Sequence, residues 1–155
     1  MSAVLQEPEI LSVLDRARSE ARTAGLPYSG SISPQDAWQL FQGGYAALVD
    51  VRSPEERKFV GQVPGTLAVP WASGTSLSRN PRFTRELEAK VKKGDVVLLL
   101  CRSGKRSALA AEAAAKAGFS NVFNVAEGFE GELDQEQRRG HSGGWRFHGL
   151  PWTQD

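Results

Sequence analysis

The sequence predicts an α/β fold in which a parallel sheet carries helices on both faces. Short apolar segments alternate with amphipathic segments of roughly ten residues, which is typical of strands joined by crossover helices. Two of these segments, 46–52 and 95–100, are nearly continuous in apolar residues, as in strands that are buried on both faces. A loop that begins with a cysteine follows the second segment, and ligands of such folds bind beyond the carboxyl ends of the strands.

Length and composition indicate one globular domain. The chain has 155 residues, of which 40% are hydrophobic and 24% charged, so it can bury a core without disulfides or a metal. Its formal net charge of +1 provides no global field for nucleic acid or an anionic membrane. Glu7, Glu9 and Asp15 stand where a secretory signal would be basic and then apolar. We therefore expect a cytoplasmic protein with no nucleic-acid or membrane partner.

The first 28 residues are expected to form an N-terminal amphipathic helix that docks on a domain spanning residues 29–155. Within 8–24, apolar residues recur at helical spacing, and Gly25 and Pro27 are placed to end the helix. These apolar residues are Ile10, Val13, Leu14, Ala17 and Ala21. Such a stripe serves either as a partner-binding arm or as core cover, and we favour core cover.

The other elements follow from start and stop signals. Ser33 and Pro34 match a capping residue and a first helical position, Gly43 ends that helix, and Gly94 and Gly118 end two later ones. The expected order is helix 34–42, strand 46–52, helix 54–60, strand 66–70, helix 83–93, strand 95–100, helix 107–116 and strand 121–125.

The segment from Gly128 to Asp155 is expected to be a loop-rich wrap rather than a second domain. It contains six glycines, and its aromatic residues Trp145, Phe147 and Trp152 are expected to pin it to the core. Its two histidines, at positions 141 and 148, are treated as surface residues.

Cys101 is the only cysteine, so the chain has no internal disulfide. His141 and His148 do not complete a zinc-ligand set with it, so we expect neither a metal nor another cofactor. An unpaired cysteine is most often a small buried hydrophobe. The neighbouring residues must decide between that role and a chemical one.

Those neighbours favour a nucleophile. The backbone amides of residues 102–107 can curl around the sulfur, with the amino end of the next helix pointing toward it. Arg102, Lys105 and Arg106 add three positive charges, which favour the thiolate form. Sulfur transfer and phosphoryl transfer both suit a thiolate in such a cradle. Four residues separate Cys101 from Arg106, and Ser107 occupies the position where cysteine-dependent phosphatases have arginine, so this tighter loop favours a transferred sulfur.

The chain resembles the rhodanese-like domain family over about Ser33 to Trp152. Four motifs in the same order carry the resemblance: Leu48-Val49-Asp50-Val51-Arg52, Gly61-Gln62-Val63-Pro64-Gly65-Thr66, Cys101-Arg102-Ser103-Gly104-Lys105-Arg106-Ser107 and Gly149-Leu150-Pro151-Trp152. The stretch from Gly128 to Gly144 is longer than the family's usual connection, and is either a specificity loop or a tolerated insertion.

The resemblance implies about five parallel strands and a ping-pong sulfurtransferase. Cys101 would take the sulfane sulfur of a small anionic donor such as thiosulfate and pass it to cyanide, a thiol or a protein acceptor. Donor binding and persulfide stabilisation would fall to the loop residues Arg102, Ser103, Gly104, Lys105, Arg106 and Ser107. Asp50 and Arg52 match a family pair that would support the strand ends near the loop.

Two other functions remain as alternatives. The first is a cysteine-dependent phosphatase or arsenate reductase, although arsenate reduction would lack a second cysteine within the chain. The second is a non-catalytic or sulfur-relay binding module, with Arg79, Arg82 and Arg85 as a docking face. Trp71 would either form a wall of the pocket or have a packing role in the core or at the rim.

Overall fold

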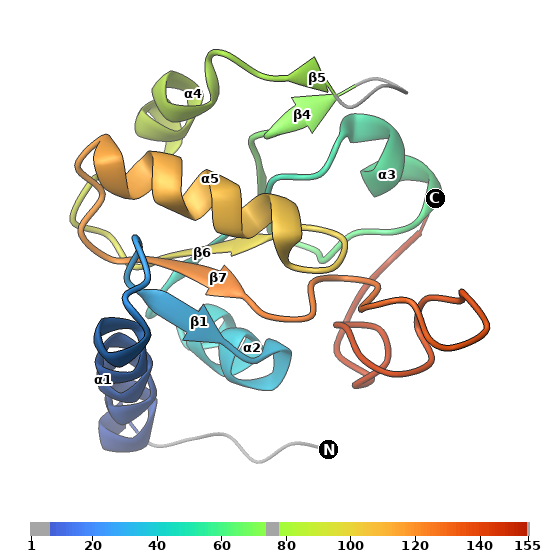
Figure 1. Ribbon diagram of the computed structural model, residues 1–155, viewed down its shortest axis with the longest axis horizontal. Helices are drawn as coiled ribbons and strands as arrows, with labels where there is room; N and C mark the ends of the chain where they lie inside the picture. The colour runs from blue at the N-terminus through green and yellow to red at the C-terminus, as the bar shows by residue number, and fades with distance from the viewer. Residues whose placement is uncertain (1–6, 74–77, 155) are drawn as a thin grey trace.

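The computed structural model describes residues 7–73 and 78–154, and a five-stranded sheet forms its centre (Figure 1). The strand order is β1-β7-β6-β2-β3, and every neighbouring pair is parallel. The strands are β1 (Gly30–Ile32), β2 (Ala47–Asp50), β3 (Leu67–Ala68), β6 (Val97–Leu100) and β7 (Val122–Val125). The predicted fold class is confirmed, and the strand that precedes Cys101 is the central one.

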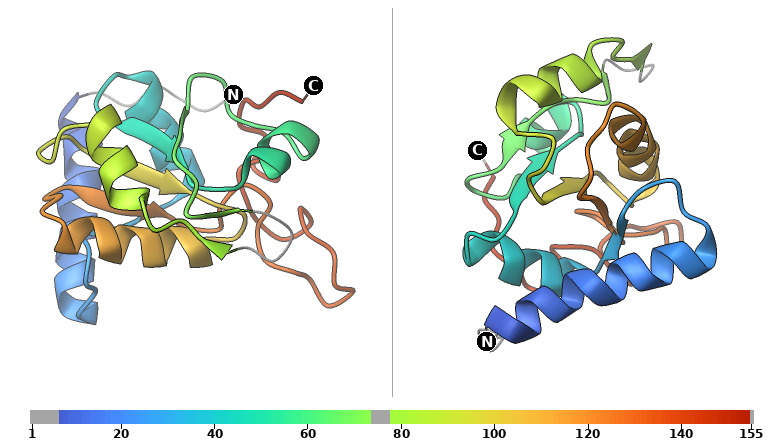
Figure 2. Two further views of the ribbon diagram at one scale, coloured as in Figure 1. Left: turned by 90° about the horizontal axis from the view of Figure 1, so that it is seen from above. Right: turned by 90° about the vertical axis from the view of Figure 1, so that its left-hand side faces the viewer.

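Helices cover both faces of the sheet, with α1 and α2 on one side and α4 and α5 on the other (Figure 2). A short fifth helix, α3, lies near the carboxyl ends of the strands. The helices are α1 (Glu7–Ala24), α2 (Pro34–Gln42), α3 (Pro54–Phe59), α4 (Phe83–Lys90) and α5 (Lys105–Lys116). A small antiparallel pair, β4 (Ala72–Ser73) and β5 (Ser78–Arg79), lies beside α5. No helix within the described ranges is both long enough and apolar enough to span a bilayer.

The apolar stripe of α1 packs against β1 and α2. All five of its predicted residues are at most 7% exposed, and burying each large aliphatic side chain contributes about 1.5–3 kcal/mol. Residues 1–6 of this N-terminal segment lie outside the described residues. The stripe therefore covers the core.

Several boundaries differ from the sequence prediction. The hydroxyl of Ser33 accepts a hydrogen bond from the Asp36 amide (3.2 Å) and caps α2, as expected. However, α5 begins at Lys105 rather than Ser107. Helix α4 ends at Lys90 because Val91 turns to an extended conformation and buries its side chain. Strand β1 was not predicted, since its three residues have no apolar pattern and become a strand by pairing with β7.

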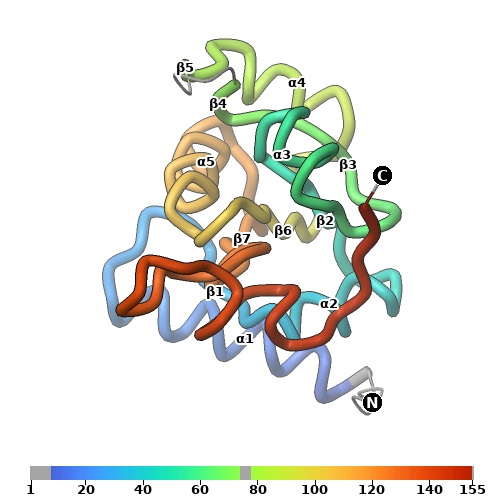
Figure 3. Tube along the Cα trace, turned by 90° about the vertical axis from the view of Figure 1, so that its right-hand side faces the viewer, coloured from blue at the N-terminus to red at the C-terminus, as the bar shows by residue number. Residues whose placement is uncertain are grey.

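The C-terminal segment lies across the carboxyl edge of the sheet, in front of β1 and β7 (Figure 3). Trp145 is fully buried and donates its indole N–H to the Pro151 carbonyl (2.8 Å). Trp152 packs edge-on against Phe129, with ring centroids 5.9 Å apart. Phe147 is 48% exposed, so the prediction that it anchors the segment is wrong. Trp145 thus anchors this edge-covering segment, whereas Trp152 is 37% exposed.

Candidate active site

Cys101 lies directly after the central strand, where the loop to α5 begins. Strand β6 pairs with β2 on one side and β7 on the other, so its carboxyl end is enclosed by neighbouring strand ends. The cysteine is 1% exposed. Its sulfur is therefore sheltered from bulk water in the ligand-binding region of this fold class.

Two donors face the sulfur. The Gly104 amide donates a hydrogen bond to Cys101 Sγ (3.1 Å), and the Ser107 hydroxyl lies 3.2 Å from the same atom. Gly104 has φ +100°, which side-chain-bearing residues rarely adopt, and this turn aims its N–H at the sulfur. Among the described residues, Gly104 supplies the backbone amide that bonds to Sγ, and the wider ring of amides from residues 102–107 stays a prediction.

Asn124 of β7 forms hydrogen bonds with both donor residues, Gly104 and Ser107. The sequence analysis did not predict this role. Its Nδ2 donates to the Gly104 carbonyl (3.2 Å), and its Oδ1 accepts from the Ser107 hydroxyl. The single hydroxyl hydrogen of Ser107 thus has two acceptors, Asn124 Oδ1 and Cys101 Sγ, and can turn toward a thiolate. The available signal was a polar residue within the otherwise apolar strand 122–125, which is buried throughout.

Arg106, one of the three predicted loop cations, is paired with a carboxylate. It lies in the first turn of α5 and forms a two-pronged ion pair with Glu56 of α3, with both N–O distances 2.7 Å. Burial raises the pKa of Glu56, but the hydrogen bonds and charge of Arg106, with hydrogen bonds from Ser53, outweigh it. The pKa falls from its ordinary 4.5 to about 2. Arg106 is therefore paired with a permanent carboxylate near neutral pH.

The other predicted loop residues lie at the mouth of the loop. Arg102 and Ser103 are half-buried and Lys105 is exposed. Arg102 Nε is buried without a hydrogen-bond partner in the described structure. Arg102 and Lys105 form no ion pair with any described residue.

The C-terminal segment forms hydrogen bonds with the backbone of the cysteine loop. The Phe129 amide donates to the Cys101 carbonyl (2.7 Å), and the Glu130 amide donates to the Arg102 carbonyl (2.9 Å). At Gly128, which has φ +66°, a Cβ would lie 2.5 Å from the carbonyl carbon of Arg102, so only glycine permits this approach. The start of the 128–144 stretch therefore supports the cysteine loop directly.

Asp50 and Arg52 form a buried ion pair near the same strand ends. Arg52 Nη2 lies 2.8 Å from Asp50 Oδ2 and also donates to the Gly61 carbonyl (2.7 Å). The guanidinium stacks over the Phe129 ring at 4.2 Å, and Arg57 adds a second cation 3.4 Å from Asp50. The pair connects β2 to the C-terminal segment and does not reach Cys101 by any hydrogen bond of the described residues.

His148 is half-buried and contacts two other side chains, so the prediction that it is a surface residue is wrong. Its Nε2 lies 2.9 Å from Glu127 Oε1, and the Gln35 side-chain amide lies 3.0 Å from its Nδ1. The Glu127 carboxylate also accepts from the Gly144 amide (3.0 Å). This chain of contacts ties the C-terminal segment to α2 rather than to the sulfur.

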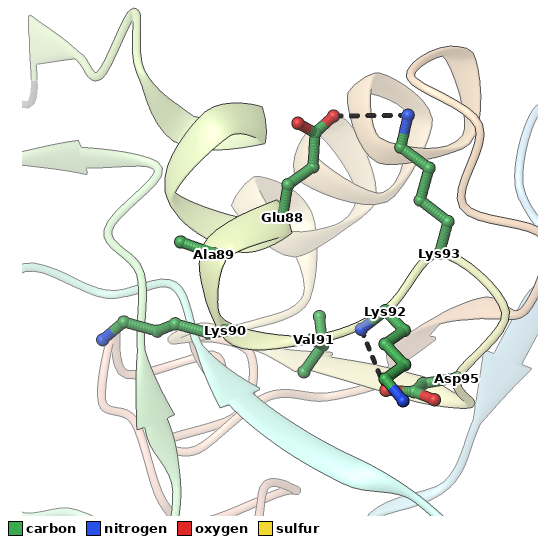
Figure 4. A pocket seen from close by; sticks show the side chains of 7 residues that line it. All are labelled: Glu88, Ala89, Lys90, Val91, Lys92, Lys93 and Asp95. Atoms are coloured by element: carbon green, nitrogen blue, oxygen red, sulfur yellow. Dashed lines mark hydrogen bonds and ion pairs between the residues drawn. The ribbon is translucent and has the colours of Figure 1, made fainter.

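A separate cavity of about 560 Å³ lies at the end of α4 (Figure 4). It is lined by residues 88–93 and Asp95, and an ion pair joins Lys93 to Glu88 (3.6 Å). Asp95 precedes the amino end of β6, so this cavity lies at the opposite edge of the sheet from Cys101. Its position excludes it from the chemistry of the cysteine.

No group of three or more histidine, cysteine or acidic residues in the described parts of the chain is arranged to hold a metal ion. The fold and the loop define an α/β protein with a buried, hydrogen-bonded cysteine at the end of its central strand. The family model of the rhodanese-like domain matches residues 33–133. The chain therefore belongs to the rhodanese-like domain family.

Three relatives illustrate the match. The crystal structure of Rv0390 from M. tuberculosis is 42% identical, with a TM-score of 0.74, and the match covers 83% of this chain and 99% of that one. Senescence-associated protein DIN1 of Raphanus sativus is 34% identical, over 83% of this chain and 79% of its own length. Thiosulfate sulfurtransferase 16, chloroplastic, of Arabidopsis thaliana is 29% identical, over 78% and 90%.

Proposed function

We propose that this protein is a sulfurtransferase that carries a sulfane sulfur on Cys101. The observation that carries the proposal is the contact of Cys101 Sγ with the Gly104 amide and the Ser107 hydroxyl. Both groups can stabilise negative charge on a thiolate or on a persulfide. The name of the Arabidopsis relative, a thiosulfate sulfurtransferase, agrees with this chemistry.

The reaction has two steps. The Cys101 thiolate attacks the outer sulfur of thiosulfate, the sulfur–sulfur bond of thiosulfate breaks, and sulfite leaves with the electron pair. The enzyme then holds a persulfide. Cyanide or a thiolate, free or on a protein, attacks the outer sulfur, and Cys101 leaves as thiolate. No metal, external redox partner or general base is required.

The pairing of Arg106 with Glu56 supports sulfur transfer over phosphoryl transfer. A phosphatase loop directs its arginine at the phosphate oxygens, whereas Arg106 directs both prongs of its guanidinium at Glu56.

Intact-protein mass spectrometry tests the proposal. Incubation with thiosulfate should add about 32 mass units, one sulfur atom, and cyanide should remove them with formation of thiocyanate. Cys101→Ser should gain no mass and keep the circular dichroism spectrum of the wild type. Hydrolysis of an aryl phosphate that depends on Cys101, without a sulfur adduct from any sulfane donor, would refute the proposal.

A further inference from the structure

Asn124 and Cys101 compete for one hydrogen atom, that of the Ser107 hydroxyl. Helix α5 packs on β6 and β7 (Figure 1), and its Ser107 contacts both the cysteine that follows β6 and Asn124 within β7. The hydroxyl lies 3.2 Å from Cys101 Sγ and also donates to Asn124 Oδ1. It has a single hydrogen, so it serves one of the two acceptors at a time. Ser107 and Asn124 are both buried, so bulk water does not supply the missing donor.

The Asn124 side chain is held in the orientation that accepts this hydrogen. Its Nδ2 donates to the Gly104 carbonyl (3.2 Å), which leaves Oδ1 facing Ser107. Among the described residues, Ser107 is the one donor to Asn124 Oδ1. When the hydroxyl turns to Sγ, a buried amide oxygen therefore loses its partner, which is unfavourable.

The outcome of this competition depends on the chemical state of the sulfur. In the thiol form, S–H can donate to the Ser107 oxygen while Ser107 donates to Asn124, so all three groups are satisfied. In the thiolate form, Sγ carries a negative charge and attracts the hydrogen. In the persulfide form, the charge lies on the outer sulfur, and Sγ is an uncharged divalent sulfur that accepts only weakly. The hydrogen therefore returns to Asn124 when the persulfide forms.

We infer that Asn124 is a positioning residue, which competes with the Cys101 thiolate for the Ser107 hydrogen and so favours the persulfide form. The inference rests on the proposed function and adds a residue that controls how readily the sulfur is released. When an acceptor attacks the outer sulfur, the sulfur–sulfur bond breaks and its electron pair passes to Sγ. The leaving thiolate gains the Ser107 hydrogen bond only if Asn124 loses it. A less stabilised thiolate is a poorer leaving group, so Asn124 slows the discharge of the persulfide.

The pH dependence of thiolate absorbance tests the competition directly. Cys101 is the single cysteine, so the difference spectrum against Cys101→Ser reports this sulfur alone and needs no sulfur donor. Asn124→Leu should lower the midpoint of the titration by about half a pH unit, because Ser107 then donates to Sγ alone. Ser107→Ala should raise the midpoint. Added to Ser107→Ala, Asn124→Leu should no longer lower it, whereas a structural role through the Gly104 carbonyl would give the same shift in both backgrounds.

Asn121→Leu is the matched control. Asn121 precedes the other end of β7, accepts from the Arg18 side chain (2.8 Å) and donates to the Gly94 carbonyl (3.1 Å). Its substitution removes a comparable pair of hydrogen bonds and should leave the midpoint unchanged. Asn124→Val removes the same acceptor as Asn124→Leu with a side chain that suits a strand, and it decides the test if the leucine variant does not fold. The charged side chains of the loop and the adjoining elements are the same in all these variants, namely Asp50, Arg52, Glu56, Arg102, Lys105 and Arg106.

Discharge of the thiosulfate-loaded protein by cyanide measures the effect on sulfur release. Thiocyanate should form about threefold faster from loaded Asn124→Leu than from the wild type, and at the wild-type rate from Asn121→Leu. Failure of thiosulfate to load Cys101 would overturn the proposed function, and the titration would still decide which group binds the hydrogen. The inference is wrong if the midpoint does not fall in Asn124→Leu, if it falls equally in the Ser107→Ala background, or if the loaded variant discharges no faster than the wild type.

Discussion

Substitution of Glu56 by Gln tests the ion pair that joins Arg106, at the end of the cysteine loop, to α3. Gln keeps the shape of the side chain and one acceptor oxygen but removes the negative charge. Arg106 is 14% exposed and would lose one of its two short hydrogen bonds to this side chain, together with the opposite charge. The substitution should therefore destabilise the junction between α3 and α5.

The magnitude follows from the pKa of Glu56. A fall from 4.5 to about 2 on folding corresponds to at most about 3 kcal/mol of stabilisation at neutral pH. The side chain is 19% exposed, so solvent screening reduces the expected loss to about 2 kcal/mol. Because folding lowers this pKa, the stabilisation is present above pH 4.5 and disappears as the pH falls toward 2.

Urea unfolding of the wild type and Glu56→Gln at several pH values measures this effect. The difference in free energy of unfolding should be about 2 kcal/mol at pH 7 and should shrink steadily below pH 4.5. Glu55→Gln is the control, since Glu55 is the exposed neighbour and should change stability by less than about 0.5 kcal/mol. A difference at pH 7 that stays constant down to pH 2.5 would show that the pair does not act through charge.

Three further substitutions test the support of the cysteine. Ser107→Ala should slow persulfide formation from thiosulfate about tenfold, because one of the two donors to Sγ is lost; an unchanged rate in stopped-flow sulfite release would contradict this. Asn124→Leu should destabilise the fold by about 1–3 kcal/mol in urea unfolding, since it removes two buried hydrogen bonds, one to the Gly104 carbonyl and one from the Ser107 hydroxyl. Gly128→Ala should lower the melting temperature by several degrees and slow persulfide formation, because its Cβ would meet the Arg102 backbone, and calorimetry that finds no change would refute that contact.

The main features of the fold follow from local sequence patterns. Strands 46–52 and 95–100 are recognisable because both faces of each are buried and both are therefore apolar. The α1 stripe and the Ser33 cap are likewise local patterns with one physical solution. Strand β1 lacks such a pattern, because its conformation comes from hydrogen bonds to β7.

The position of Cys101 was also predictable, since a loop after the central strand of a doubly wound sheet has a known location. The side chains that contact its loop were not predictable from the sequence. Asn124 lies 17 residues from Ser107 along the chain, and Glu56 lies 50 residues from Arg106. No local pattern encodes which distant polar groups meet where parallel strand ends converge.

The sequence by itself determined the α/β class and the family resemblance, and it singled out Cys101 as the candidate nucleophile, because these depend on residue order and local periodicity. Only the tertiary structure decided how the charges of the loop are paired. Arg106 forms a bidentate ion pair with Glu56 of α3, which lies 50 residues away along the chain. Such pairings form where elements that are remote in the sequence come together in the fold. They therefore depend on the tertiary structure and not on a local sequence pattern.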